Sequence, residues 1–324
     1  MADPSLLIFN DWKTDLYPYI GKAFEVAYAD RMNKLSPIIG EVTNKNTVDY
    51  ELTGSGGYGE PQVYDGLNLN MGTLLRAFKT RITPQEYNLT ATVGYKEAKI
   101  DKMGITRKVG RSLGDGMAMK VYMECLRMFG GAFDSTKVGG DGVCWANAAH
   151  PVAADSSEQA SRSHKAKSEA GTFSNLITDV LSVSAITAAQ SKANRFVTPD
   201  GMPFLCDMDT LLVSPELEAE AKKICGEDAK LYPDQSDHVN PCRDMQYIVI
   251  GGGNVGFTAT QWAVCDRRLM KEIVNIVYNT KPMVLQNKLD NPLITQFLSY
   301  SDFGVGWGDA RQIIFSTGAG TSGG

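Results

Sequence analysis

The chain has 324 residues, of which 43% are hydrophobic and 21% charged, and its formal net charge is −5. These values are typical of a folded protein of two or three domains with a substantial core, and they argue against a disordered chain and against a general affinity for polyanions. The sequence shows neither a signal peptide at its start nor a long apolar run. We therefore expect a protein that is made and kept in the cytosol and does not enter a membrane.

Six cysteines are scattered along the chain and form no Cys-x-x-Cys pair. In a chain of this size, that pattern favours reduced, half-buried apolar side chains over a disulfide framework or a zinc site. We expect neither disulfide bonds nor a bound metal.

The first 50 residues contain one amphipathic segment, in which apolar residues recur at helical spacing. They are Leu16, Ile20, Ala23, Phe24, Ala27 and Tyr28. Two interpretations are open: an arm that crosses a neighbouring molecule, or a first helix packed on the body of the protein. A strand-like piece, residues 48–52, follows. The glycine- and asparagine-rich residues 53–73 predict a loop, and they lack the lysine spacing of a phosphate-binding loop.

Residues 74–95 are predicted to form a long β-hairpin. Residues 74–82 and 87–95 both read as extended, and the turn between them contains a proline. A two-stranded hairpin is barely stable alone in water, so we expect it to lie on a second copy of the chain. The expected contacts between subunits are salt bridges between the basic residues of one arm and an acidic segment; the alternative is a strand face that only meets solvent. The residues concerned are Arg76, Lys79 and Arg81 on the arm, and Glu216, Glu218 and Glu220 on the acidic segment.

A long helix is predicted over residues 103–131, because apolar residues recur there at steps of three and four. Asp101 can cap its start, and Gly130 and Gly131 provide its stop. Four glycines weaken its first half, each costing about 1 kcal/mol relative to alanine. We expect either a kink near residues 114–116 or close packing against another chain there.

The second half of the chain mixes helices with short apolar strands. The polar residues 153–171 predict an exposed loop, a helix is expected from Phe173, and another begins at Pro215. The glycine-rich residues 317–324 are expected to be disordered. The predicted strands are 211–213, 247–250, 262–266, 273–277, 294–300, 303–307 and 312–316.

Residues 248–256 match the dinucleotide-binding fingerprint, with Gly251, Gly253 and Gly256 after an apolar strand. The threonine- and aromatic-rich residues that follow do not predict the helix that a pyrophosphate requires, so a glycine-rich hairpin turn is favoured. His150 is interpreted as a structural hydrogen-bonding residue, and Asp207 and Asp209 lack the rest of a calcium loop. We therefore predict no catalytic residue, no cofactor and no metal site, and a protein that is not an enzyme.

Several short segments, taken in their order, resemble a known family. They are residues 139–143 with Trp145 and His150-Pro151, residues 211–218 with Ala221, Trp262-Ala263 with Asp266, and residues 301–304 with Arg311. This order is similar to that in the major capsid proteins of tailed bacteriophages, which share the HK97 fold. The resemblance is closest to the major head subunit of Mu-like phages.

The resemblance implies an α+β fold with named parts. Residues 1–48 would be an N-terminal arm, and residues 49–102 an extended E-loop hairpin. Residues 103–171 would form the peripheral domain with its spine helix at 103–131, and residues 172–278 the axial domain. Residues 279–324 would supply strands that return to the peripheral domain, and the C-terminal tail.

The function implied is a major capsid protein that assembles itself, as pentamers and hexamers, into an icosahedral shell around double-stranded DNA without reading its sequence. Such a protein belongs to the virion and is assembled in the host cytoplasm, with a portal and a decoration protein as further partners. Because the sequence starts directly with the arm, we expect a separate scaffold protein. No motif identifies a lysine–asparagine pair for covalent crosslinking. The alternatives are an encapsulin-like cellular compartment shell with an enzyme cargo and an NAD(P)-dependent oxidoreductase based on residues 251–256.

Overall fold

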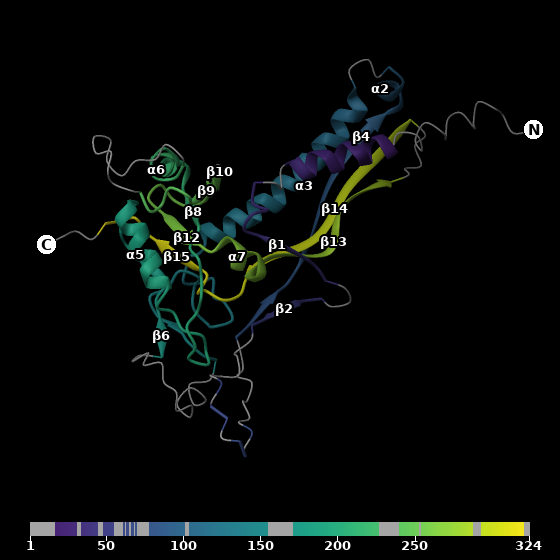
Figure 1. Cartoon of the computed structure of the whole chain (residues 1–324). Helices are drawn as coiled ribbons and strands as arrows, with labels where there is room; N and C mark the ends of the chain where they lie inside the picture. The colour runs from purple at the N-terminus through teal and green to yellow at the C-terminus, as the bar shows by residue number, and fades with distance from the viewer. Residues whose placement is uncertain are drawn as a thin grey trace, which may run out of the picture.

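The computed structural model (Figure 1) describes residues 17–30, 34–44, 48–54, 61, 63, 64, 66, 67, 69, 78–100, 104–154, 171–226, 240–252, 254–287 and 293–320. Two sheets dominate the fold, and one long helix runs past both of them. No helix in these ranges is long and apolar enough to span a membrane.

The smaller sheet has five short strands in the order β7-β15-β12-β8-β9. Three of them, β8, β12 and β15, are buried at every position, which explains their uninterrupted apolar sequences. The helices α5 and α6 share a core with this sheet. The bounds are β7 Leu176–Ile177, α5 Val183–Ala193, β8 Thr210–Val213, α6 Glu218–Ile224, β9 Gln246–Val249, β12 Trp262–Cys265 and β15 Ile313–Ser316. The strands expected over 211–213, 247–250, 262–266 and 312–316 are confirmed.

The larger sheet has the order β1-β13-β14-β4. Its two central strands, β13 (Val274–Asn287) and β14 (Ile294–Trp307), have 14 residues each and pair antiparallel. The strand β1 (Gly40–Thr43) runs parallel to β13, and β4 (Gln85–Gly94) runs antiparallel to β14. The two strands expected over 294–307 are therefore one continuous strand, and β13 continues ten residues beyond the predicted end at Val277.

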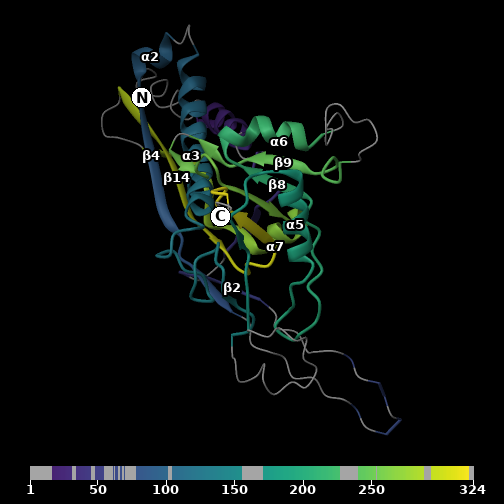
Figure 2. The same cartoon turned by 90° about the vertical axis from the view of Figure 1, so that its left-hand side faces the viewer.

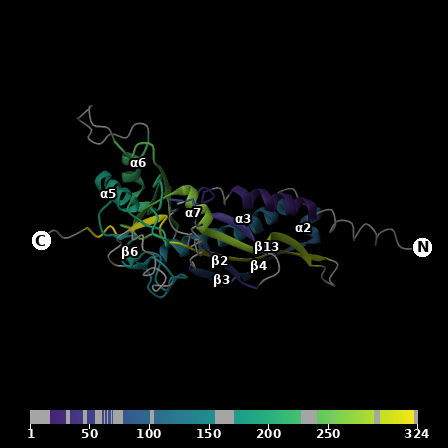
Figure 3. The same ribbon diagram turned by 60° about the horizontal axis from the view of Figure 1, so that its bottom comes forward.

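One face of the larger sheet is covered by α3 (Ile105–Gly130) and by the helical residues 17–30, which Figure 3 shows on the same side of it. Ile20 and Phe24 are buried there against α3 and the sheet. The N-terminal segment is thus, over residues 17–30, a first helix packed on the body. The backbone of this first helix lies directly on two glycines of α3. A Cβ at Gly110 would lie 2.6 Å from the carbonyl oxygen of Ile20, and a Cβ at Gly114 would lie 2.5 Å from that of Phe24.

The predicted 103–131 helix is confirmed, with two corrections. It runs without interruption through residues 114–116, and the close packing there is within the same chain. Gly110 and Gly114 lie on the helix at residues 17–30, and a Cβ at Gly116 would lie 2.9 Å from the side chain of Leu89. The stop at Gly131 is as predicted. The residue before the first turn is Gly104, in the left-handed region with φ 64°, while Asp101 lies outside the described residues.

The predicted hairpin over residues 74–95 is wrong. The strand β3 (Lys79–Ile82) pairs with β2 (Tyr50–Thr53), whereas all ten residues of β4 pair with β14. The physical reason lies in β14. All ten residues of β4 can pair with it, and it has glycines at the positions where β3 crosses it. A Cβ at Gly306 would lie 2.5 Å from the side chain of Ile82, so only glycine lets β3 pass over this strand. Residues 74–77 lie outside the described residues.

The remaining elements are short. They are α2 Tyr95–Lys99, β5 His150–Pro151, β6 Thr172–Phe173, the 3₁₀ turn η1 Pro215–Leu217, β10 Gly251–Gly252, β11 Val255–Gly256 and α7 Arg267–Ile273. The helix expected from Phe173 begins only at Val183, because Ser182 caps it and the preceding residues form strands. The expected disorder of the tail is wrong for its first part, since the amide of Thr317 donates to the carbonyl of Ile177. Residues 155–170 and 321–324 lie outside the described residues.

Candidate functional site

Between its ends, the segment from β2 to β3 is described at residues 61, 63, 64, 66, 67 and 69. These residues lie far from both sheets, at the lower edge of Figure 2. Large apolar side chains are exposed among them: Val63 is 94% exposed, Leu67 87% and Leu69 84%. Apolar side chains gathered on a projecting segment are typical of a surface that another molecule covers. The sequence signal for this surface was available, because apolar residues interrupt an otherwise glycine- and asparagine-rich loop.

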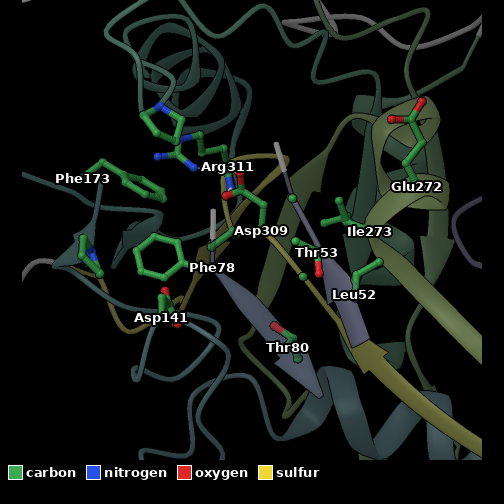
Figure 4. A pocket seen from close by; sticks show the side chains of 15 residues that line it. Leu52, Thr53, Phe78, Thr80, Asp141, Phe173, Glu272, Ile273, Asp309 and Arg311 are labelled. Atoms are coloured by element: carbon green, nitrogen blue, oxygen red, sulfur yellow. Dashed lines mark hydrogen bonds and ion pairs between the residues drawn. The ribbon is translucent and has the colours of Figure 1, made fainter. Parts of the chain in front are cut away.

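A cavity of about 230 Å³ lies where this segment joins the body (Figure 4). Leu52 and Phe78 line it from the β2–β3 side, and Asp141, Phe173 and Arg311 line it from the body. The cavity therefore lies under the base of the projecting segment.

Arg311 holds four parts of the chain together beside this cavity. Its guanidinium donates to the carbonyl of Val197 at 2.9 Å, to the carbonyl of Val152 at 2.7 Å and to the carboxylate of Asp309 at 2.7 Å. It also lies over the ring of Phe173, 4.7 Å from the ring centre. Since these partners use its donors while the side chain is buried, Arg311 has a structural role.

His150 forms a second buried polar cluster in the same region. Its Nδ1 lies 2.6 Å from Oδ2 of Asp141, and its Nε2 lies 3.1 Å from Oδ1 of Asn175. The amide nitrogen of Asn175 donates to two backbone carbonyls, so its oxygen is the acceptor and Nε2 of His150 is the donor. The structural role predicted for His150 is confirmed.

This cluster supports the base of the projecting segment. Asp141 belongs to the loop that follows α3, and in that loop the amide of Gly140 donates to Oγ1 of Thr80 in β3 at 3.1 Å. A Cβ at Gly140 would also meet the backbone of Lys79. The His150–Asp141 contact therefore fixes a loop on which β3 rests.

The residues predicted for contacts between subunits have partners within the chain. Lys79 pairs with Glu51 at 3.5 Å, and Arg81 pairs with Asp49. The hydrogen bond from Arg81, with that from Thr83, lowers the pKa of Asp49. These partners follow from the β2–β3 register, which the sequence did not reveal.

The acidic set lies elsewhere, on η1 and α6. Glu218 pairs with Lys222 at 2.8 Å and Glu220 with Lys223 at 2.6 Å, whereas Glu216 is exposed. Figure 1 shows α6 and β2 well apart, so one chain does not bring the two sets together. Arg76 lies outside the described residues. The contact between subunits stays a prediction.

The glycine-rich residues 251–256 form the hairpin that the sequence favoured. The strands β10 and β11 pair antiparallel, with Gly251 opposite Gly256, and Gly256 has φ 101°. The chain then passes through a turn into β12, so no helix follows to receive a pyrophosphate. The dinucleotide-binding interpretation is therefore wrong, although Gly253 lies outside the described residues.

The described ranges do not bring metal-binding side chains together, and their cysteines are not paired. These ranges hold no cluster of three or more metal-binding side chains, and all six cysteines are free. Burial raises the pKa of the Cys125 thiol to about 12 and that of Cys225 to about 11, so both remain protonated. Asp209 accepts a hydrogen bond from the amide of Arg267 at the start of α7, which is a structural use of this carboxylate.

The outer edge of β4 is a further surface that sequence reasoning missed. Within the described residues, β4 pairs only with β14, so its other edge has no strand beside it. Most of its side chains are exposed, including Leu89 at 45%. An unpaired edge of ten residues can accept another strand.

The fold is similar to that of solved capsid structures. The capsid of the native GTA particle has a TM-score of 0.50 and 14% sequence identity, covering 88% of this chain and 89% of that chain. The capsid of the Cyanophage P-SCSP1u has a TM-score of 0.50 and 9% identity, covering 86% of each chain. The virus-like particle from Pyrococcus furiosus has a TM-score of 0.47 and 9% identity, covering 93% of this chain and 98% of that chain. No family model and no curated protein sequence matches the chain. The α+β, HK97-like capsid fold expected from the sequence is confirmed.

Proposed function

We propose that the chain is the major subunit of an icosahedral capsid that encloses double-stranded DNA. The observation that carries the proposal is the fold, shared with capsid proteins over most of the chain. The protein would be a structural one, without catalytic activity. It would assemble in the host cytoplasm and end up in the virion, and kinship with Mu-like head subunits rests on the short sequence segments alone.

Two surfaces support a role that depends on contacts between copies. The apolar side chains of Val63, Leu67 and Leu69 in the β2–β3 segment are more than four-fifths exposed in the described structure, so a neighbouring copy can cover them. The open edge of β4 offers a surface on which such a segment from a neighbour can lie. Many modest contacts add up in a shell, because each subunit touches several others.

The parts of the chain can be assigned with revised boundaries. We assign residues 50–82 to the E-loop, ending before the expected residue 102, because β4 pairs with β14. We assign α3, β4, β13 and β14 to the peripheral domain and the five-stranded sheet to the axial domain. This moves β15 to the axial domain, since it pairs with β12. The N-terminal arm would be the segment before the helix at residues 17–30.

The test is assembly of the full-length chain, examined by negative-stain electron microscopy and sedimentation velocity. We expect shells, tubes or rings of five and six subunits. The triple variant Val63→Asp, Leu67→Asp, Leu69→Asp should unfold at the same temperature as the parent but form few particles. A control with Val63→Ile, Leu67→Met and Leu69→Met keeps the surface apolar and should assemble. A parent chain that stays a single molecule at high concentration, and that forms no particles in the producing cells where a scaffold protein is present, would refute the proposal.

An encapsulin-like compartment shell is the second candidate, since it would have the same fold. Particles purified from the producing cells and treated with nuclease distinguish the two. Protected duplex DNA supports the capsid, and a co-purified enzyme bound inside supports the compartment.

We also propose salt bridges between neighbouring subunits, from Arg76, Lys79 and Arg81 of one to Glu216, Glu218 and Glu220 of the other. These contacts remain a prediction, as do a scaffold, a portal and a decoration protein.

A further inference from the structure

The far end of the larger sheet carries a dense group of positive charges. Residues 95–111 contain six basic and two acidic residues, a local net charge of +4 in a chain whose total is −5. Five of the basic side chains are exposed: Lys96 and Lys99 on α2, and Arg107, Lys108 and Arg111 on α3. We call these five residues the basic end. The helix α2 contacts α3, and Figure 1 shows them together at the tip of the molecule.

The basic end has no neutralising partner in the described part of the chain. No ion pair joins any of its five residues to a carboxylate of those ranges. The carboxylate of Glu97 accepts a hydrogen bond from the amide of Gly94. Lys99 lies over the ring of Tyr95, a contact that attracts the ammonium group but does not neutralise its charge.

The arrangement is unfavourable for an isolated chain. Arg107 and Arg111 are four residues apart on one helix, as close neighbours of like charge, and Lys108 lies three residues before Arg111. Arg107 and Lys108 also lie in the first turn of this 26-residue helix, at the positive end of its macrodipole, where cations are repelled. The first turn of α3 contains no acidic residue, and Gly104 provides no side-chain cap. A bound anion would relieve each of these repulsions.

We propose that the basic end binds the phosphate backbone of double-stranded DNA. The inference rests on the proposed function, which places DNA inside a shell of these subunits. Five cations on two adjacent helices need a partner with several closely spaced charges, and duplex DNA carries one per about 1.7 Å of its axis. A single phosphate group would leave most of these cations unpaired.

The test measures binding of the full-length chain to a fluorescein-labelled 30-base-pair duplex by fluorescence anisotropy, from 50 to 200 mM NaCl. The variant Arg107→Gln, Lys108→Gln, Arg111→Gln should bind less tightly at every salt concentration. The slope of log affinity against log salt should become shallower by about 2 to 3, because each lost phosphate contact removes about 0.9 from it. Glutamine is a good helix former, so the helix should persist and the unfolding temperature should not fall.

The control variant removes three exposed basic residues elsewhere: Arg195→Gln, Arg268→Gln and Lys271→Gln. It has the same net charge as the test variant, and its affinity and salt slope should stay close to those of the parent. Equal slopes for the two variants would overturn the proposal. So would tight binding of poly-glutamate together with weak binding of the duplex, because the partner would then be an acidic polypeptide. Assembly is scored separately by microscopy, so failure to form shells and failure to bind DNA are distinguishable.

Discussion

The two sheets of this protein differ in how completely their own chain covers them. In the smaller sheet, β8, β12 and β15 are buried at every position. In the larger sheet, β4 is exposed along most of its length and has one unpaired edge in the described structure. The three central strands of the smaller sheet are thus fully covered by their own chain, whereas the larger sheet has an exposed strand that another molecule can cover. The predictions below test this difference, from the largest expected effect to the smallest.

Leu212→Ala should be the most destabilising of these changes. Leu212 is buried in the middle of β8 within the main core. Removing its side chain leaves a cavity that the surrounding sheet cannot fill, so we expect a loss of about 2–5 kcal/mol in the free energy of unfolding. Urea denaturation followed by circular dichroism measures it. A loss below about 1 kcal/mol would mean that the smaller sheet is not tightly packed.

Alkaline pH should weaken the attachment of the first helix to the larger sheet. The hydroxyls of Tyr28 and Tyr278 lie 2.6 Å apart, and burial raises the pKa of Tyr28 to about 12 and also raises that of Tyr278. Between pH 10 and 12 the unfolded chain loses a proton from each of these two tyrosines, whereas the folded chain keeps them. The contribution of this pair to stability is therefore full below pH 10, and toward pH 12 it should fall by about 2–3 kcal/mol for Tyr28, with a further loss from Tyr278.

The control for this pH effect is the double variant Tyr28→Phe, Tyr278→Phe. Its unfolding free energy, measured by urea denaturation at the same pH values, should fall less steeply above pH 10. Parallel curves for variant and parent would show that this pair does not contribute to the alkaline loss.

Gly114→Ala should separate the helix at residues 17–30 from α3. The new Cβ would lie 2.5 Å from the carbonyl oxygen of Phe24, a backbone atom that cannot rotate away. We expect a loss of about 1–3 kcal/mol, measured by thermal unfolding. Gly21→Ala is the matched control, because its Cβ would meet nothing within 4 Å and alanine favours a helix by up to about 1 kcal/mol. Equal effects of the two changes would contradict the close helix contact.

Leu89→Ala should have the smallest effect on stability. Leu89 is 45% exposed on β4, so truncation removes little buried surface. We expect a loss below about 1 kcal/mol in urea denaturation. A loss as large as that of Leu212→Ala would show that β4 belongs to a closed core, and the comparison between the two sheets would fail.

Sequence reasoning succeeded where local patterns determine the structure. The apolar runs at β8 and β12 are buried on both faces, and such strands are recognisable without knowing their partners. The three- and four-residue spacing of apolar side chains identified α3. The threonine- and aromatic-rich sequence after Gly256 correctly excluded a helix there.

It failed where a distant segment decides the outcome. The partner of β4 is β14, about 200 residues later, and nothing near residue 85 indicates it. The sequence does not indicate that β13 continues beyond Val277, because polar residues interrupt the apolar pattern there. These residues are in the strand because they pair with β14. The helix α7 was missed because it has only seven residues. Asp266, which caps its start, was assigned to the end of the predicted strand 262–266. The β2–β3 register likewise decides that Lys79 and Arg81 meet Glu51 and Asp49.

The helix α3 is held near both ends by contacts that leave no room for a side chain. Gly110 and Gly114 lie on the helix at residues 17–30, and Gly130 lies on the backbone of Gly256 in the β10–β11 hairpin. Its 26 residues make a rod about 39 Å long. Because both contacts are backbone contacts without free space, a shift of the hairpin is passed along the helix to the segment at residues 17–30. The helix therefore couples two parts of the chain that are more than 100 residues apart in sequence.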